Sequence, residues 1–196
     1  MDFIDFLIKS ETPKEAENML DFSQKLGFSG LCIETDLKNI ENLREKFPNV
    51  KILSIAEAKK IEDATKLKES HDLVFARSVD MDFNRKVSET PEIDMLLDPF
   101  DTSMCQFDQV MARLCKMNKI SVGFSFSNLI FNDKLTRSNL MKSMLELSRI
   151  LIKYKTPFRL VSGAVEKNGM RSSSELISFG RILGFKDPDI KSSLIT

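Results

Sequence analysis

A short stretch of the chain, residues 157–180, combines an apolar strand, a loop with two cations and the start of a helix. Lys167 and Arg171 lie in the loop, and Ser172 and Glu175 follow with the spacing of a capping box, which marks a helix N-terminus at Ser172. The first N–H groups of a helix point toward a ligand, and basic side chains beside them add positive charge. This spacing predicts an anion-binding site.

Three further cations follow a predicted strand in the middle of the chain. Arg77 ends the apolar run 72–76, and Arg85 and Lys86 lie in the segment after it. The loops after parallel strands meet at one face, so we expect these cations on the same face as Lys167 and Arg171. Cations without catalytic partners suit nucleic-acid phosphates, where positioning and counterion release supply the affinity. Solvated loop charges are the alternative interpretation of the same residues.

The residue types that catalytic sites require are scarce. The single histidine, His71, begins a predicted strand at the end away from the expected functional face, and a hydrolytic metal site would need several. Asp98 and Asp101 could pair as acid and base, but carboxylates that cap a loop beside Pro99 explain them better. No predicted strand carries a central lysine, as a Schiff-base enzyme would. We therefore predict no catalytic residue and no metal site.

Cysteine spacing and hydropathy exclude other classes of protein. Cys32, Cys105 and Cys115 are far apart and lie among apolar neighbours, so we expect buried, reduced thiols. No apolar run approaches the roughly 18 residues that a membrane span needs. The N-terminus lacks the basic start of a signal peptide. These features predict a cytoplasmic protein that does not enter a membrane.

The chain has no net charge, but its two halves differ in sign. Residues 1–100 carry 14 Lys+Arg and 21 Asp+Glu, a net charge of −7. Residues 101–196 carry 15 Lys+Arg and 8 Asp+Glu, a net charge of +7. An asymmetry of this size indicates a polyanionic or acidic partner for the second half, unless solvated helix faces simply differ.

Strand-like apolar runs alternate with helical patterns along the whole chain, and these elements must position the cations. We predict strands within residues 3–8, 31–33, 50–55, 72–76, 93–97, 120–127 and 158–161. We predict helices within residues 13–26, 36–47, 57–69, 84–89, 107–115, 136–154, 172–184 and 187–194.

Strict alternation over seven units predicts a parallel sheet, because each crossover returns the chain to the same end. An open doubly wound sheet is the alternative, but the Gly-rich nucleotide turn typical of it is missing. Val122 and Phe124 alternate with Ser121, Gly123 and Ser125, which suits a barrel with large side chains against helices and small ones inside. We predict an α/β fold, a compact (β/α) TIM-like barrel of about seven parallel strands, as a single domain over residues 1–196.

Residues 70–185 contain a series of short motifs, each of which occurs once. The motifs are VFAR (74–77), NRKV (84–87), IDMLL (93–97), FSF (124–126), RSNL (137–140), KYK (153–155), SGA (162–164), MRS (170–172) and Leu176. Each is weak alone, but their order and spacing together resemble protein component 3 of archaeal and eukaryotic ribonuclease P. The first strands match this family mainly in pattern.

The resemblance implies a barrel-like, noncatalytic subunit of archaeal ribonuclease P, the assembly that removes the 5′ leader from precursor tRNA. The RNA subunit would perform the hydrolysis with Mg²⁺, and the protein itself would bind no cofactor. The implied partners are the ribonuclease P RNA, other protein subunits including one small partner subunit, and precursor tRNA as substrate of the assembly. The matching RNA-binding positions are Arg77, Arg85 and Arg171, with Lys86 and Lys167 as neighbours.

Two other functions remain open from the sequence. A stand-alone metal-dependent phosphoesterase on a similar barrel would need histidines at the strand ends, and His71 is the only histidine. A protein-binding scaffold would use the basic half to meet an acidic partner. RNA affinity would distinguish this scaffold from the ribonuclease P subunit.

Overall fold

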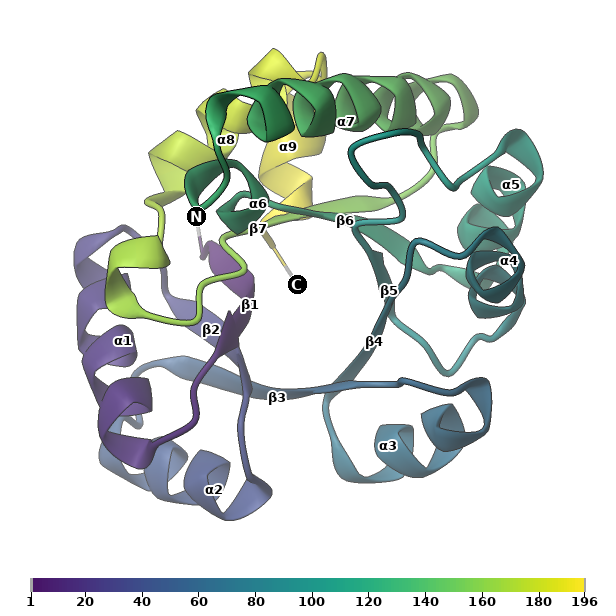
Figure 1. Cartoon of the computed structure of the whole chain (residues 1–196). Helices are drawn as coiled ribbons and strands as arrows, with labels where there is room; N and C mark the ends of the chain where they lie inside the picture. Colours follow the sequence, from purple (N-terminus) through teal and green to yellow (C-terminus); the bar gives the residue numbers. More distant parts are fainter. Residues whose placement is uncertain (1, 196) are drawn as a thin grey trace.

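Seven short parallel strands pair in chain order in the computed structural model, which describes residues 2–195. They are β1 (Ile4–Lys9), β2 (Gly30–Glu34), β3 (Lys51–Glu57), β4 (Leu73–Arg77), β5 (Met95–Leu97), β6 (Ser121–Ser125) and β7 (Phe158–Val161). Figure 1 looks along the strands and shows them arranged in a ring. The predicted TIM-like barrel is therefore confirmed.

Within residues 2–195, the ring closes between β7 and β1 without an eighth strand. Beyond β7, Ala164 forms a parallel bridge with Ile8, and its carbonyl accepts the Lys9 N–H at 2.8 Å. At the other end of β1, the Ile4 N–H donates to the carbonyl of Leu194 at 2.7 Å. The segment after β7 and the end of the C-terminal helix thus accept hydrogen bonds from the backbone N–H groups at the two ends of β1.

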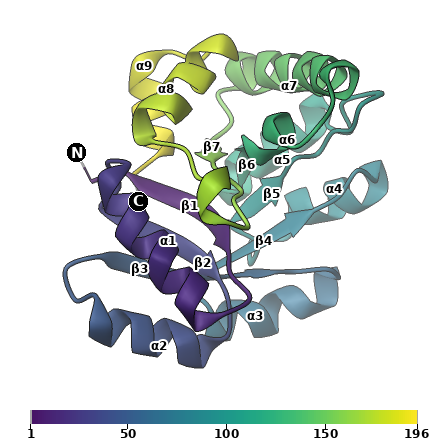
Figure 2. The ribbon, with the colours of Figure 1, turned by 60° about the vertical axis from the view of Figure 1, so that its left-hand side comes forward.

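Helices cover the outside of the barrel on all sides (Figure 1 and Figure 2). They are α1 (Pro13–Lys25), α2 (Leu37–Lys46), the 3₁₀ helix η1 (Ile61–Asp63), α3 (Ala64–Ser70), α4 (Met81–Glu89), α5 (Gln109–Asn118), α6 (Ser127–Ile130), α7 (Lys134–Tyr154), the 3₁₀ helix η2 (Lys167–Gly169), α8 (Ser173–Ile182) and α9 (Asp187–Ser193). No helix within residues 2–195 has the length and apolar character to cross a membrane.

The helix predicted over 84–89 begins earlier, at Met81, because Asp80 caps it by accepting the Phe83 N–H at 2.7 Å. Two other predicted boundaries are wrong because strand pairing or a turn takes precedence over the local pattern. The helix predicted over 57–69 starts later, since Glu57 still belongs to β3 and the Ala58 N–H donates to the carbonyl of Phe75 on β4 at 2.7 Å. The strand predicted over 120–127 ends at Ser125, because Ser127 begins the short helix α6.

The predicted apolar face of the helix 107–115 is also wrong in part. Phe107 is buried but precedes α5, which begins at Gln109. Val110, expected in the core, is 46% exposed. Asp108 explains the later start, since its side chain accepts the Val110 and Met111 N–H groups as the N-cap.

The alternation in β6 packs as predicted. Val122 and Phe124 are fully buried in the core that the outer helices share with the strands. Gly123 faces the interior, where a Cβ atom would lie 2.6 Å from Leu97 Cδ1 and 2.9 Å from Met95 Sδ. A side chain at position 123 would therefore overpack the barrel interior.

The three cysteines are free thiols, as predicted, although Cys105 is only partly buried. Burial raises the pKa of Cys105 to about 12 and that of Cys115 to about 11. Cys32 lies in the barrel interior, and burial raises its pKa well above the ordinary value of a thiol. The thiols are therefore protonated at neutral pH and act as small apolar side chains.

A buried carboxylate, Asp5, lies at the closure between β1 and β7. Its Oδ1 accepts the Ser162 N–H at 3.0 Å, whereas Oδ2 has no hydrogen-bond partner within residues 2–195. Burial raises the pKa of Asp5 to about 6, although hydrogen bonds from Ser162 oppose the shift. The closure therefore contains a carboxyl group that is charged at neutral pH at a cost in stability.

We expect Asp5→Asn to make the free energy of unfolding less sensitive to pH. Native Asp5 keeps its proton to a higher pH than the unfolded chain does, so the wild type loses stability as the pH rises from about 4 to 6. Relative to the variant, this loss amounts to about 3 kcal/mol at most. Urea unfolding of both proteins at pH 4.5 and 7.5 measures the difference. Parallel pH profiles would contradict the assignment.

Candidate nucleic-acid interface

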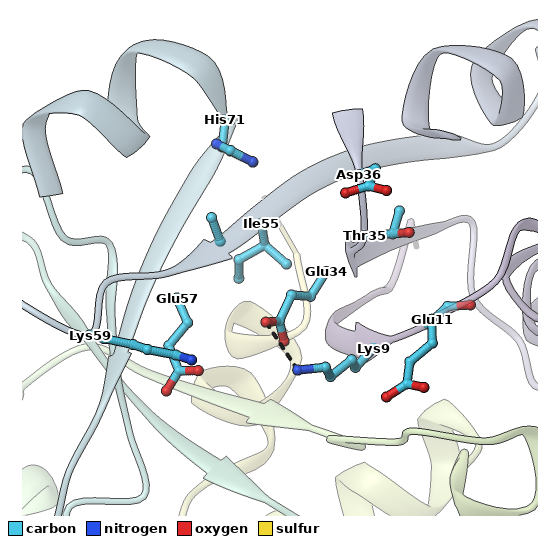
Figure 3. A pocket seen from close by; sticks show the side chains of 11 residues that line it. Lys9, Glu11, Glu34, Thr35, Asp36, Ile55, Glu57, Lys59 and His71 are labelled. Carbon is cyan, nitrogen blue, oxygen red and sulfur yellow. Dashed lines mark hydrogen bonds and ion pairs between the residues drawn. The ribbon is translucent and has the colours of Figure 1, made fainter. Parts of the chain in front are cut away.

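The face formed by the carboxyl ends of the strands is acidic beside β1, β2 and β3. A pocket of about 370 Å³ opens there (Figure 3), with Lys9 Nζ 3.4 Å from Glu34 Oε1. Its charged lining comprises Glu11, Glu34, Asp36, Glu57, Lys9 and Lys59. Four carboxylates against two lysines disfavour a phosphate at this side of the face.

The sequence predicts His71 at the end away from this face, but His71 lines one edge of the same pocket, where it takes part in a helix end. It is the C-cap residue of α3, and its Nδ1 lies 2.9 Å from Ser70 Oγ and 3.2 Å from the carbonyl of Leu67. Among residues 2–195, no three His, Cys, Asp or Glu side chains gather closely enough to hold a metal ion.

Arg77 marks the basic side of the face, at the end of β4. Its Nη2 lies 3.6 Å from Asp98 Oδ2 and 3.5 Å from Ser125 Oγ, and about half of its side chain is exposed. Asp98 is buried, and its Oδ1 accepts the Ser125 N–H at 2.8 Å. Burial raises the pKa of Asp98, and the charge of Arg77 opposes the shift. Asp98 thus joins the ends of β5 and β6 and orients Arg77.

A second pocket, of about 470 Å³, lies beside Arg77. Its lining includes Asp98, the amides of Asn128 and Asn132, and the apolar side chains of Phe100 and Leu140. The site combines one exposed cation with amide donors and acceptors. It can hold a polar or anionic group. Its two carboxylates are engaged with the backbone, because Asp98 Oδ1 accepts the Ser125 N–H and Asp101 Oδ1 accepts the Ser103 and Met104 N–H groups.

Arg171 lies on the other side of the end of β6. Its guanidinium lies 5.5 Å from the ring centroid of Phe126, and its Nη1 donates to the carbonyls of Asn168 and Met170 at 3.1 and 2.6 Å. Arg77 and Arg171 therefore contact consecutive residues, Ser125 and Phe126. The structure brings together two cations that are far apart in the chain.

The capping box at the start of α8 is confirmed, but it occupies two of the N–H donors that an anion would use. The Ser172 N–H donates to Glu175 Oε2 at 2.8 Å, and the Glu175 N–H donates to Ser172 Oγ at 3.2 Å. The Ser173 N–H donates to the carbonyl of Leu26 at 3.1 Å. The hydrogen bond from Ser172 also lowers the pKa of Glu175, which keeps a negative charge there. The Arg171 side chain, rather than the helix start, is the available anion-binding group.

The other three cations predicted from the sequence are Lys167, Arg85 and Lys86. They contact other parts of the molecule than Arg77 and Arg171 do. Lys167 is in the same loop as Arg171, and its Nζ lies 4.6 Å from the ring centroid of Phe22 on α1. Arg85 is on α4 and pairs with Asp108 at 3.0 Å. Lys86, also on α4, lines a pocket of about 540 Å³ between α4 and η1.

Sequence reasoning missed two supporting residues. It favoured a loop cap over an acid–base pair for Asp98, and it placed Phe126 in a strand and in the FSF motif without a role at the site. The order of an apolar run, Asp98 and Pro99 could have suggested a buried strand-end carboxylate. No local signal indicates that the Phe126 ring lies under Arg171, because that contact joins the residue after β6 to the loop after β7.

The family model for RNase P subunit p30 matches residues 2–196. The chain belongs to this family. Two relatives are both named ribonuclease P protein component 3. The protein from Thermococcus kodakarensis is 25% identical over 158 residues, which cover 80% of this chain and 71% of the relative. The protein from Methanosarcina mazei is 22% identical over 209 residues, which cover 100% and 86%.

Solved structures share the fold. A chain of archaeal ribonuclease P with mature tRNA superimposes with a TM-score of 0.78 at 17% identity, over 97% of this chain and 86% of that one. A prolidase complexed with N-methylphosphonate-L-proline superimposes with a TM-score of 0.66 at 8% identity, over 98% and 72%. One barrel architecture therefore occurs in proteins of different function.

We expect the double variant Arg77→Gln, Arg171→Gln to bind structured RNA more weakly and with a shallower salt dependence. Each lost phosphate contact changes the slope of log K against log salt by about 0.7 to 0.9. Electrophoretic or fluorescence titrations between 50 and 300 mM salt measure the slope. The matched control is Lys38→Gln, Lys66→Gln, which removes two exposed cations from α2 and α3. An equal loss in both variants would argue against a specific contact.

Proposed function

We propose that the chain is a noncatalytic protein subunit of an archaeal ribonuclease P that helps to remove the 5′ leader from precursor tRNA. The match of the RNase P subunit p30 family to residues 2–196 carries this proposal. The archaeal relatives named ribonuclease P protein component 3 and the shared fold with a chain of archaeal ribonuclease P support it.

The proposed mechanism is electrostatic and positional. The RNA subunit holds Mg²⁺ and performs the hydrolysis, whereas exposed cations of the protein neutralise phosphates that repel one another in the folded RNA. Arg77 and Arg171 are well suited to this role, because side-chain and aromatic contacts orient both guanidinium groups at one strand end. The RNA would then keep its active conformation at a lower Mg²⁺ concentration.

A noncatalytic role agrees with the chemistry of the site. The carboxylate beside Arg77 is buried and hydrogen-bonded to the Ser125 backbone, so it is poorly placed to activate water for an external substrate. Its neighbours in the pocket are amides, a guanidinium, hydroxyls, apolar groups and the carboxylate of Asp101, whose Oδ1 is occupied by the Ser103 and Met104 N–H groups. These groups can bind and orient, and they provide no nucleophile with an adjacent base.

In this role the protein works as one part of a larger assembly of RNA and protein. Its partners are the ribonuclease P RNA and the other protein subunits, among them one small subunit, with precursor tRNA as the substrate of the whole assembly. The protein itself holds no cofactor, and the assembly works in the cytoplasm. The barrel provides a rigid frame on which the RNA-facing side chains keep fixed positions.

Reconstitution of ribonuclease P tests the proposal. Omitting the chain from an otherwise complete assembly should shift the Mg²⁺ dependence of 5′ leader cleavage to higher concentrations and lower the rate at low Mg²⁺. The chain alone should leave precursor tRNA intact. Unchanged cleavage at low Mg²⁺ without the chain would refute a supporting role. Cleavage by the chain without RNA would instead favour a stand-alone phosphoesterase.

A further inference from the structure

The positive charge of the second half of the chain is concentrated away from the strand-end cations. Residues 109–155 contain nine Lys+Arg and only two Asp+Glu, a net charge of +7. This equals the net charge of residues 101–196 as a whole. The segment consists mainly of α5 and α7, so these two helices, rather than the loop with Lys167 and Arg171, produce the charge asymmetry.

The cations of α5 and of the end of α7 gather on one surface, because the two helices pack together (Figure 1). Thr156 Oγ1 donates to the carbonyl of Ala112 at 3.0 Å, and Lys116 Nζ donates to the carbonyl of Tyr154 at 3.3 Å. We name this region the α5–α7 basic surface. It consists of Arg113, Lys116, Lys119, Lys153 and Lys155.

Tyr154 lies at the centre of the α5–α7 basic surface. Arg113 Cζ and Lys153 Nζ lie 5.2 and 5.6 Å from its ring centroid, and its hydroxyl donates to Gln109 Oε1 at 2.7 Å. All five cations are exposed. In the part of the chain that the structure describes, none of the five forms an ion pair with a carboxylate. Their charge is therefore available to an external anion.

Two of these lysines occupy strained backbone positions. Lys119 follows α5 with φ 60° and ψ 26°, and Lys155 follows α7 with φ 52° and ψ 45°. A left-handed residue after a helix is usually glycine, because a Cβ atom makes this conformation about 1 kcal/mol less favourable. The same chain uses Gly27 after α1 and Gly184 after α8, with φ of 84° and 88°. Lysine after both α5 and α7 therefore lowers stability where glycine would fit.

Favourable interaction with the helix dipole does not explain why lysine, rather than glycine, occupies positions 119 and 155. A cation near a helix C-terminus is stabilising by about 0.3 to 1 kcal/mol, but Lys116 and Lys153 already supply one in the last turn of each helix. A second lysine at the left-handed position adds strain and repulsion between like charges. Backbone strain that persists at Lys119 and Lys155 indicates that the two lysine side chains have a function.

We propose that the α5–α7 basic surface binds the phosphate backbone of RNA, as a contact region separate from the strand-end cations. This inference rests on the proposed function as a ribonuclease P subunit. RNA is favoured over an acidic protein because four of the five cations are lysines, which are depleted from the cores of protein interfaces. Lysine suits phosphate as a mobile point charge, and no geometric fit to one sequence is required.

The double variant Lys119→Gly, Lys155→Gly tests the inference without unfolding the protein. Glycine relieves the strain at both positions, so thermal stability should stay equal or rise. The slope of log K against log salt for the RNA subunit of ribonuclease P should become shallower by about 1.4 to 1.8. At 0.1 M salt this corresponds to an affinity about 30-fold lower. Lys119→Asn, Lys155→Asn, which also tolerates the left-handed conformation, should behave in the same way.

The control Lys38→Gln, Lys66→Gln removes the same charge from α2 and α3 and should leave the slope within about 0.3 of the wild type. An unchanged slope in both the Gly and the Asn variants would overturn the inference. So would an unchanged RNA affinity combined with lost binding to another protein subunit, because an acidic protein would then be the partner. Leader cleavage by the wild-type assembly is a separate readout. If it proves independent of the chain, the proposed function fails, whereas the slope still decides whether this surface binds RNA.

Discussion

Closing a barrel with only seven strands is the constraint on which the rest of the structure depends. The parallel bridge between Ile8 and Ala164 replaces a strand pair, and Asp5 accepts the Ser162 N–H beside it. On β7, Arg159 Nη1 donates to the carbonyl of Ser193 at 3.1 Å and thereby holds the C-terminal helix beside β1. The loop after β7 starts from this closure, so the positions of its cations follow from it.

The cations of the acidic half, residues 1–100, and those of the basic half, residues 101–196, differ in the groups they most often contact. Most ion pairs involve cations of the acidic half, as Lys46 pairs with Glu17 at 2.6 Å, although Lys46 also lies over the ring of Phe47 and Arg181 of the basic half pairs with Asp187. In the basic half, several cations lie over aromatic rings, as Arg171 does over Phe126 and Arg113 over Tyr154. A ring limits the freedom of a cation but leaves its net charge in place. Such cations remain able to meet phosphate.

The barrel also shows why a shared fold does not carry a shared reaction. The same strand-end face that holds catalytic groups in barrel enzymes has here an acidic side around the Lys9–Glu34 pair and a basic side around Arg77. A buried carboxylate orients the arginine, and the neighbouring amides complete a binding surface. The proposed noncatalytic role would use this distribution of charge over a rigid frame.

The sequence by itself determined the features that depend on local pattern. Apolar runs placed all seven strands, the residues Ser172 and Glu175 specified a capping box, and alternation in β6 specified which side chains face inward, because each of these depends on neighbouring residues. Tertiary structure alone decided which distant groups meet. It brought Arg77 and Arg171 to the same strand end, paired the Ser173 N–H with Leu26 and placed lysines in the left-handed positions after α5 and α7. These outcomes depend on barrel closure and helix packing, which join segments that have no common pattern in the sequence.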